Sequence, residues 1–375
     1  MNKYRQHIFD TARRVVIKAG SGVLTGDDGL NLTAVDSISS DISALMDRGI
    51  EIIFVSSGAI AAGRKKIGMT HQSLDLPARQ AAAAIGQSDL IMEYENAFAR
   101  CDKKVAQILL TADDLSNRRR YLNARNTIHT LLSWKVVPII NENDTVVVEE
   151  IKFGDNDNLA AMIAMLMDAD LLINLTDTDG LYDKDPRTHA DAVLIESVSS
   201  ISKKMEEAAG TIPGALGTGG MLSKVKAAKK VIASGVPMMI ANGCRPNVLP
   251  DLFAGKADGT FFQPKPHKLP SKKRWIAFSL KPKGTLVVDD GAASALVKKG
   301  KSLLPSGISE VMGDFGMGAP VTLVNRKGEK LGIGLVNYKS ADIRCILGLR
   351  SCDIAGELGH KPYDEVIHRD NMVVA

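Results

Sequence analysis

Apolar and polar positions alternate along the first 250 residues in a pattern that predicts a buried parallel sheet. Six short apolar runs, rich in β-branched residues, each end at a threonine, an asparagine or a glycine, which is typical of strands that are buried on both faces. Helical patterns lie between them, with Ile38, Ile42, Leu45 and Met46 on one face of the first. The alternation predicts an α/β domain with a doubly wound, mainly parallel sheet. The runs are VVIKAG (15–20), IEIIFVSSG (50–58), VAQILLT (105–111), VVPIIN (136–141), DLLINLT (170–176) and PMMIANG (237–243).

The pattern changes after residue 253. Residues 254–274 are rich in lysine, proline and glycine, a composition that predicts a linker. The runs beyond it are short and alternating, with frequent glycines and few helix signals, which predicts a small β-rich, barrel-like module. The chain is therefore expected to hold an α/β domain (1–253), a linker (254–274) and a β-rich domain (275–375).

Composition excludes several classes of protein. The chain has 45% hydrophobic and 24% charged residues, which is ordinary for a globular protein. A net charge of +4 is too small to indicate nucleic-acid binding by itself. No apolar run reaches the roughly 18 residues that a membrane span needs, and the N-terminus lacks the apolar core of a signal peptide. A cytoplasmic protein with no membrane partner is therefore expected.

Polar side chains gather where the predicted strands end. Residues 141–144 read Asn-Glu-Asn-Asp, residues 176–180 read Thr-Asp-Thr-Asp-Gly, and residues 154–158 open a helical pattern with Gly-Asp-Asn-Asp-Asn. Open α/β sheets bind ligands at the carboxyl ends of their strands, beside the helix starts. These groups suit a small polar ligand and a metal-bound phosphate.

Three glycine-containing loops are candidates for binding anions. Lys18 precedes Ala-Gly-Ser-Gly, residues 217–224 read GTGGMLSK before an amphipathic helix, and residues 56–58 read Ser-Ser-Gly before a helix of small residues. Backbone N–H groups in such loops face phosphate, and a lysine adds positive charge. Taken alone, the loop after Lys18 is better explained as a plain turn, and the Ser-Ser-Gly loop is as compatible with a helix cap as with an anion site. The loop 217–224 is better explained as a phosphate clamp than as a surface loop.

In this combination and order, the motifs resemble the amino acid kinase family. The C-terminal blocks VDDGAASAL (288–296) and KSLLPSGI (301–308) resemble a PUA domain. There are three departures from the family pattern: Gly22 replaces a small polar residue, Ser223 a threonine and Asn174 an apolar residue. The matching kinase blocks are SSGAIAAGR (56–64), AAAAIGQSDL (81–90), LNARNTI (122–128), PIINENDTV (138–146), GDNDNLAA (154–161), LTDTDGLYDKDPR (175–187) and GTGGMLSK (217–224).

The resemblance implies phosphorylation of the side-chain carboxylate of L-glutamate by ATP, which yields γ-glutamyl phosphate in the first step of proline biosynthesis. Lys18 and Lys224 would neutralise the transferring phosphoryl group, and Asp157 would orient them. Mg²⁺ would arrive bound to ATP, so no metal site made by the protein is expected. The resemblance further implies a glutamate site made of Ser57, Asn141, Asp144, Asp155 and Asn156, and an ATP site made of Lys18, Thr176, Asp177, Thr218, Gly219, Gly220, Met221, Leu222, Ser223 and Lys224.

Other hypotheses stay open on the sequence. A related kinase acting on aspartate, N-acetylglutamate, carbamate or UMP would share the fold. RNA binding is a second hypothesis, because PUA domains occur in RNA-modifying enzymes and residues 268–283 are basic around Trp275, although a basic linker is the preferred interpretation. A purely structural C-terminal module is the third. The resemblance also implies a homo-oligomer, a dimer or a tetramer, and hand-over of the product to glutamyl phosphate reductase.

Overall fold

The computed structural model describes residues 3–26, 29–69, 74–146, 156–210, 220–265 and 270–374. The chain divides into two compact units, Met1–Lys268 and Leu269–Ala375, here called the N-terminal and the C-terminal unit. Each has its own sheet and its own hydrophobic core. Within the described residues, no helix combines the length and the apolar character that crossing a lipid bilayer requires.

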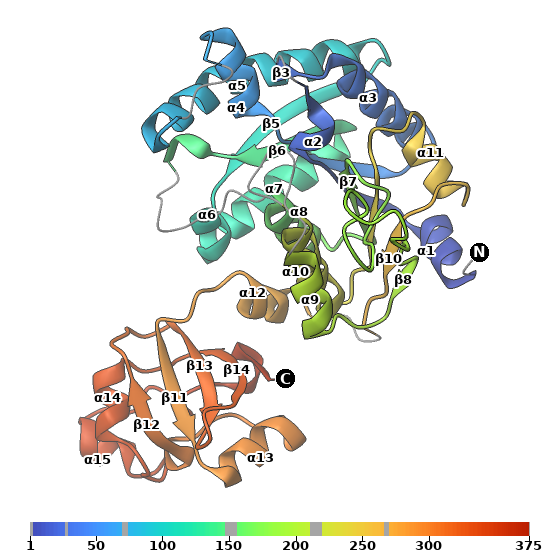
Figure 1. Ribbon diagram of the computed structural model, residues 1–375. Helices are drawn as coiled ribbons and strands as arrows, with labels where there is room; N and C mark the ends of the chain where they lie inside the picture. Colours follow the sequence, from blue (N-terminus) through green and yellow to red (C-terminus); the bar gives the residue numbers. More distant parts are fainter. Residues whose placement is uncertain are drawn as a thin grey trace. The chain divides into compact units, whose positions relative to one another are not determined.

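The N-terminal unit is built on a single large sheet (Figure 1). Among the described residues it has eight strands in the order β5-β6-β4-β1-β7-β9-β10-β8. All neighbours are parallel except β9 and β10. Each of the six predicted runs forms one of these strands, so the predicted α/β fold with a mainly parallel sheet is confirmed. The strands are β1 (Arg14–Ala19), β4 (Glu51–Val55), β5 (Lys104–Leu110), β6 (Val136–Glu142), β7 (Leu171–Thr176), β8 (Ser197–Val198), β9 (Met238–Asn242) and β10 (Thr260–Phe262).

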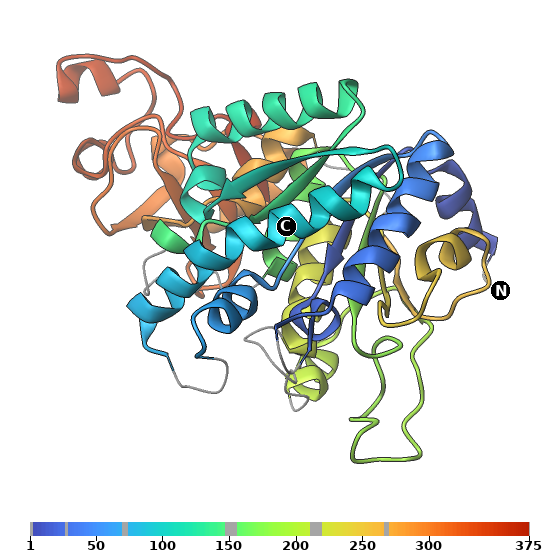
Figure 2. The same ribbon diagram turned by 90° about the horizontal axis from the view of Figure 1, so that it is seen from above.

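Helices cover both faces of this sheet (Figures 1 and 2). The connections through α3 and α5 run along the strand order in one direction, and those through α7, α8 and α10 run in the other. Because such crossovers are right-handed, the two sets of helices lie on opposite faces. The elements are α1 (Lys3–Thr11), α2 (Ser21–Leu24), the hairpin β2 (Thr25–Gly26) and β3 (Gly29–Leu30), α3 (Leu32–Asp47), α4 (Ala59–Lys66), α5 (Leu76–Ala99), α6 (Ala112–Ser116), α7 (Arg118–Ser133), η1 (Asp144–Val146), α8 (Asn156–Leu166), α9 (Lys203–Gly210), α10 (Met221–Ala233) and α11 (Val248–Phe253).

Strand alternation decides which side chains reach the α8 face. Ile17 of β1 and Ile173 of β7 belong to the core that includes α3 and α5. Successive residues of a strand point to opposite faces, so Lys18 and Asn174 point towards α8 and α10. These two residues are register partners on adjacent strands. The sheet therefore places a lysine and an amide side by side beneath the first turn of α8.

Two glycines bring α4 and α5 into backbone contact. A Cβ atom at Gly63 would lie 1.8 Å from the carbonyl oxygen of Ala82, and one at Gly86 would lie 1.9 Å from that of Ala59. No larger residue fits at either position without moving a helix. Since α4 begins directly after Ser56-Ser57-Gly58, this contact fixes the position of that loop at the end of β4.

The C-terminal unit is a small β-rich domain, as predicted. Among its described residues, five strands follow the order β12-β11-β13-β14-β15, in which only β11 and β13 are parallel. Leu286, Leu323 and Tyr338 belong to its core. The elements are α12 (Ser271–Phe278), β11 (Gly284–Val288), α13 (Asp290–Lys299), η2 (Pro305–Gly307), β12 (Ile308–Met312), β13 (Pro320–Asn325), β14 (Lys330–Leu335), α14 (Ser340–Cys345), α15 (Ile354–Leu358), η3 (Arg369–Asn371) and β15 (Met372–Val374).

The segment 254–274, predicted as a linker, is not one throughout. It contains β10, which pairs with β9 and β8 and buries Phe261 and Phe262 in the N-terminal unit. It also contains the start of α12 at Ser271. Three strand residues are too few to show an alternating pattern, and the lysines and prolines around them hide the strand in the composition.

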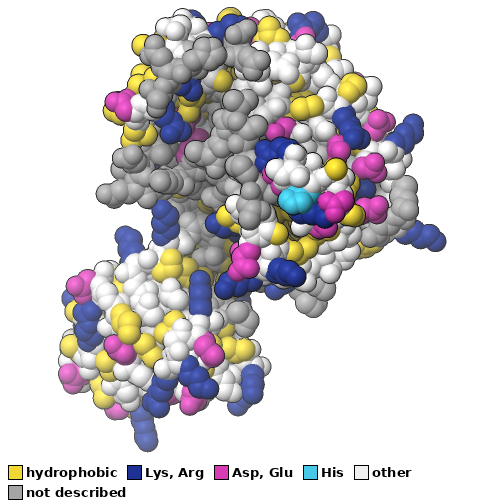
Figure 3. Space-filling view, in the orientation of Figure 1, with side chains coloured by type: hydrophobic (Ala, Val, Ile, Leu, Met, Phe, Trp, Pro, Cys, Tyr) yellow, Lys and Arg dark blue, Asp and Glu magenta, His cyan; other side chains and the backbone are white. Residues whose placement is uncertain are grey.

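The basic stretch around Trp275 does not present its aromatic ring to solvent. Within α12, Arg274 is 2% exposed and Trp275 is 7% exposed, so both lie in the interior. Binding of single-stranded RNA uses exposed aromatic rings between cations. On the face shown in Figure 3, basic side chains of the C-terminal unit are scattered among acidic and apolar ones. The ring of Trp275 therefore does not support the RNA hypothesis, which otherwise stays a hypothesis.

Candidate active site

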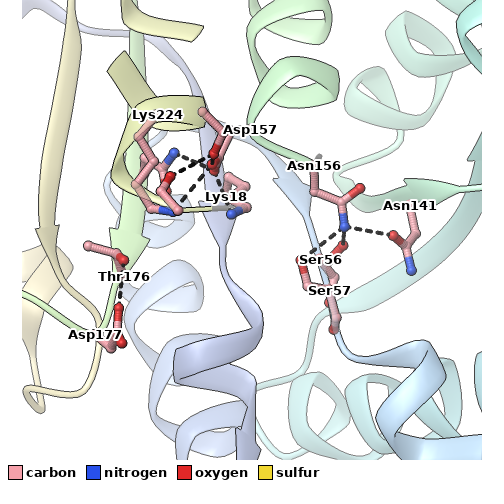
Figure 4. Close-up of polar contacts among 12 residues, drawn as sticks. Lys18, Ser56, Ser57, Asn141, Asn156, Asp157, Thr176, Asp177 and Lys224 are labelled. Carbon is pink, nitrogen blue, oxygen red and sulfur yellow. Dashed lines mark hydrogen bonds and ion pairs between the residues drawn. The ribbon is translucent and has the colours of Figure 1, made fainter. Parts of the chain in front are cut away.

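The polar side chains predicted at strand ends come together on four neighbouring strands. In the order β6-β4-β1-β7, the sheet supplies Asn141 from β6, Ser57 from the residues after β4, Lys18 from β1 and Thr176 from β7. These strands are parallel, so their carboxyl ends lie at one edge. The first turn of α8 adds Asn156 and Asp157, as the close-up shows (Figure 4).

Asp157 is the centre of a charged cluster. Its side chain is fully buried, and Lys18 and Lys224 are 4% and 5% exposed. The Nζ atom of Lys18 donates to Oδ1 at 2.6 Å, and that of Lys224 donates to Oδ2 at 3.2 Å. Oδ1 also accepts from Nδ2 of Asn174 at 2.7 Å, and Oδ2 from the hydroxyl of Ser223 at 2.5 Å. The structure thus joins the three residues predicted to be catalytic.

The two ammonium groups keep Asp157 ionised. Burial alone would raise the pKa of Asp157, but the charges of Lys18 and Lys224, with the hydrogen bonds from Lys18 and Ser223, hold it well below its usual range. The cluster therefore carries two positive charges against one negative charge. A net positive, water-excluded site of this kind attracts a phosphoryl group.

Asn156 is the centre of a second, neutral cluster. Its Nδ2 atom donates to the backbone oxygen of Ser56 at 2.8 Å, to the hydroxyl of Ser57 at 2.9 Å and to Oδ1 of Asn141 at 3.1 Å. Its Oδ1 atom is buried and has no hydrogen-bond partner among the described residues. One amide thus ties the ends of β4 and β6 together and leaves an acceptor for a ligand that carries N–H groups.

Tyr94 and Asn174 support these clusters but were not predicted as site residues. Ser56 forms a buried hydroxyl–hydroxyl hydrogen bond of 2.9 Å with Tyr94 of α5, and this contact links the loop after β4 to the helix behind it. Asn174 contacts Asp157, as described above. A polar residue within an apolar run marks Asn174 in the sequence, whereas nothing local marks Tyr94.

Asp144 lies in η1, two residues after the end of β6. Burial raises the pKa of Asp144 to about 6, while the positive charge of Arg79 acts in the opposite direction. This carboxylate therefore changes charge within a pH range that an assay can reach. Asp155, predicted beside it in the glutamate site, lies outside the described residues.

The predicted nucleotide site is described in part. The hydroxyl of Thr176 donates to Oδ1 of Asp177 at 3.0 Å. A Cβ atom at Gly22 would lie 3.1 Å from Cγ of Asp177, so the glycine leaves room for this carboxylate. In the other loop, Gly220 is the N-cap of α10, and Met221, Leu222, Ser223 and Lys224 form its first turn. Thr218 and Gly219 lie outside the described residues.

The part of the chain that the structure describes contains no group of three histidine, cysteine, aspartate or glutamate side chains placed to hold a metal ion. The oxygens of Asp157 already accept from lysine, amide and hydroxyl donors. While these donors are in place, the carboxylate of Asp157 has no lone pair left for a metal ion.

Comparisons with known proteins agree with this geometry. The model of the amino acid kinase family matches residues 13–242, and that of the PUA domain matches residues 284–358. Glutamate 5-kinase from Syntrophus aciditrophicus (strain SB) is 52% identical over 374 residues, covering 100% of this chain and 97% of that protein. The enzyme of the same name from Geobacter sulfurreducens is 52% identical over 371 residues, covering 99% and 100%.

Among solved structures, carbamate kinase from Giardia lamblia bound to AMP-PNP superimposes with a TM-score of 0.50 at 16% sequence identity, covering 68% of this chain and 100% of that one. This likeness supports the fold alone. The relatives that span the full length are about half identical and share one name, which confirms the predicted resemblance. The chain belongs to the amino acid kinase family and, within it, to the glutamate 5-kinases.

Proposed function

We propose that this chain transfers the γ-phosphoryl group of ATP to the side-chain carboxylate of L-glutamate, forming γ-glutamyl phosphate and ADP, the first step of proline biosynthesis. The observation that carries the proposal is the buried ion cluster, in which one aspartate positions Lys18 of β1 and Lys224 of α10. The neutral cluster on β4 and β6 lies beside it, where an acceptor substrate would sit.

The reaction needs charge neutralisation more than it needs a base. A glutamate side chain has an ordinary pKa near 4.3, so it is already an anion at neutral pH and attacks without losing a proton. The difficulty is repulsion between this anion and the phosphate oxygens, together with alignment of the attacking and leaving oxygens. Lys18 and Lys224 supply the compensating charge. Asp157 holds their positions before the substrates arrive, so little reorganisation is required.

Residues of the neutral cluster would bind glutamate. Ser57, Asn141 and Asn156 offer hydroxyl and amide groups within one hydrogen-bonded set. The carboxylates of Asp144 and Asp155 would face the α-ammonium group of the substrate. The free acceptor on Asn156 is also suited to that N–H donor.

The nucleotide would lie towards β7 and the start of α10, contacting Thr176, Asp177 and the loop 218–224. Mg²⁺ would enter on the phosphates of ATP, where it neutralises charge and fixes their geometry. Meanwhile the chain's own lysines would hold the phosphoryl group from the protein side. Because γ-glutamyl phosphate is a reactive acyl phosphate, prompt hand-over to glutamyl phosphate reductase would protect it.

Trapping with hydroxylamine tests this function. The purified protein is incubated with ATP, Mg²⁺ and hydroxylamine, and L-glutamate is compared with aspartate, N-acetylglutamate and UMP. Both ADP and, for the carboxylates, hydroxamate are measured. Hydroxamate formed with glutamate alone is the expected result. ADP release with another acceptor would retain the fold and the phosphoryl transfer but assign a different substrate. No turnover with any acceptor would contradict the proposal.

A further inference from the structure

Asn174 is a buried polar side chain within a strand that is otherwise apolar over its interior. Residues Leu171–Leu175 of β7 are all fully buried, and Asn174 is the polar residue among them. Burying an amide is unfavourable unless its groups are hydrogen-bonded. Register pairing puts Asn174 beside Lys18 of β1 and beside Ile240 of β9. An apolar residue would satisfy the packing of this position, so packing alone does not account for the amide.

The amide is oriented by the carboxylate of Asp157. An ionised carboxylate only accepts hydrogen bonds, so Nδ2 of Asn174, not its oxygen, must face it. Nδ2 lies 2.7 Å from Oδ1 of Asp157, the same oxygen that accepts from Lys18 at 2.6 Å. The amide oxygen then points away and is buried without a hydrogen-bond partner among the described residues. The contact to Asp157 is thus kept although it leaves one acceptor unsatisfied.

We propose that Asn174 is a positioning residue for phosphoryl transfer, which acts by fixing the plane of the Asp157 carboxylate. This inference rests on the proposed function of the site. With Asn174 present, each oxygen of Asp157 accepts from one lysine and one neutral donor, which are Asn174 at Oδ1 and Ser223 at Oδ2. The two neutral donors hold the carboxylate against rotation. Asp157 in turn holds both ammonium groups where the phosphoryl group is transferred.

Without Asn174, Oδ1 loses its neutral donor and keeps the contact with Lys18. The carboxylate can then turn about its Cβ–Cγ bond, and the ammonium of Lys18 turns with it. A displacement of about 1 Å between a catalytic group and the reacting atoms lowers rates by up to roughly a hundredfold. Binding of either substrate in the ground state does not depend on that alignment to the same degree. The turnover number should therefore fall more than the Michaelis constants change.

Substitution by leucine, which has a similar volume, separates a positioning role from a structural one. Asn174→Leu removes the donor and also the unsatisfied oxygen, so the thermal midpoint should stay unchanged or rise. The value of kcat should fall roughly tenfold or more, with both Michaelis constants within about threefold of wild type. A change in which stability and turnover move in opposite directions is not expected from a packing defect.

Leu172→Val is the matched control, because Leu172 lies on the same strand and the same face, two residues away. It should lower the thermal midpoint and leave kcat per folded molecule near wild type. If Asn174→Leu fails to fold, Asn174→Val gives the same test with a smaller, β-branched side chain. If an Asn174 variant loses both stability and turnover, the proposal survives only when its kcat falls at least tenfold below that of Leu172→Val.

Wild-type kcat in the folded Asn174→Leu variant would overturn the proposal, and so would a loss of stability with unchanged kcat. A double-mutant cycle with Ser223→Ala adds a second criterion, since both donors restrain the same carboxylate. The fold reduction in kcat of the double variant should differ from the product of the reductions in the two single variants. If it equals that product, the two donors act independently, which would count against a shared role. Failure of the proposed function is distinguishable, because then the wild-type protein itself forms no hydroxamate.

Discussion

Two adjacent residues at the start of α8, Asn156 and Asp157, serve clusters of opposite character. Asn156 binds hydroxyl, amide and carbonyl groups at the ends of β4 and β6, and Asp157 binds two ammonium groups that come from β1 and α10. The charged set is buried and the neutral set is partly buried, and the two sets also differ in charge. Neutral hydrogen bonds each contribute about 1 kcal/mol and favour binding, whereas preorganised charge stabilises the transition state far more. The neutral cluster should control substrate affinity and the charged cluster should control turnover.

The largest effect is expected from removing a charge of the ion cluster. Lys224→Ala should lower kcat by roughly 10² to 10³, the usual effect of deleting one preorganised donor to developing charge. Asp157 keeps its contact with Lys18, so the fold should survive. Steady-state ADP release, with folding checked by circular dichroism, measures this effect.

Lys226→Ala is the control for that experiment. Lys226 lies two residues further along α10 and is exposed, so its loss changes the net charge equally without touching the cluster. It should turn over at the wild-type rate. A near-normal kcat in Lys224→Ala, or equal losses in the two variants, would contradict the assignment of the charged cluster to turnover.

A smaller effect, on affinity, is expected from the neutral cluster. Asn156→Ala removes the donor shared by Ser56, Ser57 and Asn141, so the KM for glutamate should rise about tenfold to a hundredfold. The KM for ATP should change by less than about threefold, because the nucleotide residues lie on β7 and α10. Titrating each substrate at a saturating level of the other measures both values.

Asn158→Ala is the matched variant on the same helix. Asn158 bonds Lys230 of α10 and contacts neither cluster through the hydrogen bonds described above. Its KM for glutamate should stay near wild type. If Asn156→Ala raises the KM for glutamate and the KM for ATP equally, the assignment of glutamate affinity to the neutral cluster is wrong.

The sequence predicts the strand ends well and the pairing of side chains poorly. Apolar, β-branched runs that stop at polar residues locate the ends of β1, β4, β6 and β7, since that pattern is local. Asp157 and Lys18 are 139 positions apart, and Asp157 and Lys224 are 67 apart, so no spacing within a motif foretells their contact. The family resemblance, not the periodicity, supplied that association.

Other features escaped prediction for related reasons. Tyr94 lies 38 positions from Ser56. The pattern of apolar residues in its helix indicates that Tyr94 is buried but not which residue it contacts. The strand β10 has three residues, and its neighbours' composition resembles a linker. Asn174 is visible as a polar residue in an apolar run, but its use depends on a helix that lies elsewhere in the sequence. In each case the missing information is a tertiary contact.

The pH dependence of affinity distinguishes Asp144 from the neutral cluster. Burial raises the pKa of Asp144 to about 6. Above that value the carboxylate is charged and would attract the α-ammonium group of glutamate, and below it the group is protonated and the attraction is lost. The KM for glutamate should therefore rise several-fold as pH falls from about 7.5 to 5.5, while the KM for ATP, measured alongside, changes less.

Asp144→Asn tests that assignment directly. The variant should have a raised KM for glutamate that no longer depends on pH over this range, because its amide stays neutral. Asp144→Ala should likewise raise the KM for glutamate more than that for ATP. A variant that keeps the wild-type pH profile would show that another group titrates.

The smallest effect is expected at Asp41, a buried carboxylate whose pKa is raised, whereas the pKa of Asp157 is lowered. Asp41 of α3 is 4% exposed and accepts a hydrogen bond from the backbone N–H of Leu249 at 3.1 Å. Burial raises the pKa of Asp41 to about 6, partly offset by that hydrogen bond, with Asp251 adding to the rise. Asp157 shows the opposite shift because two ammonium groups contact it.

The raised pKa of Asp41 determines how its contribution to the free energy of unfolding changes with pH. Between about pH 4 and 6 the unfolded chain ionises Asp41 while the folded chain keeps it protonated, so its contribution to stability falls as pH rises through 6. Asp41→Asn keeps the acceptor for Leu249 without the charge. It should therefore stabilise the protein at pH 8 by about 1 kcal/mol, and the gain should shrink towards pH 5. Denaturant unfolding at both pH values measures this difference, and a variant that is less stable at pH 8 would show that the charge of Asp41 is compensated as well as that of Asp157.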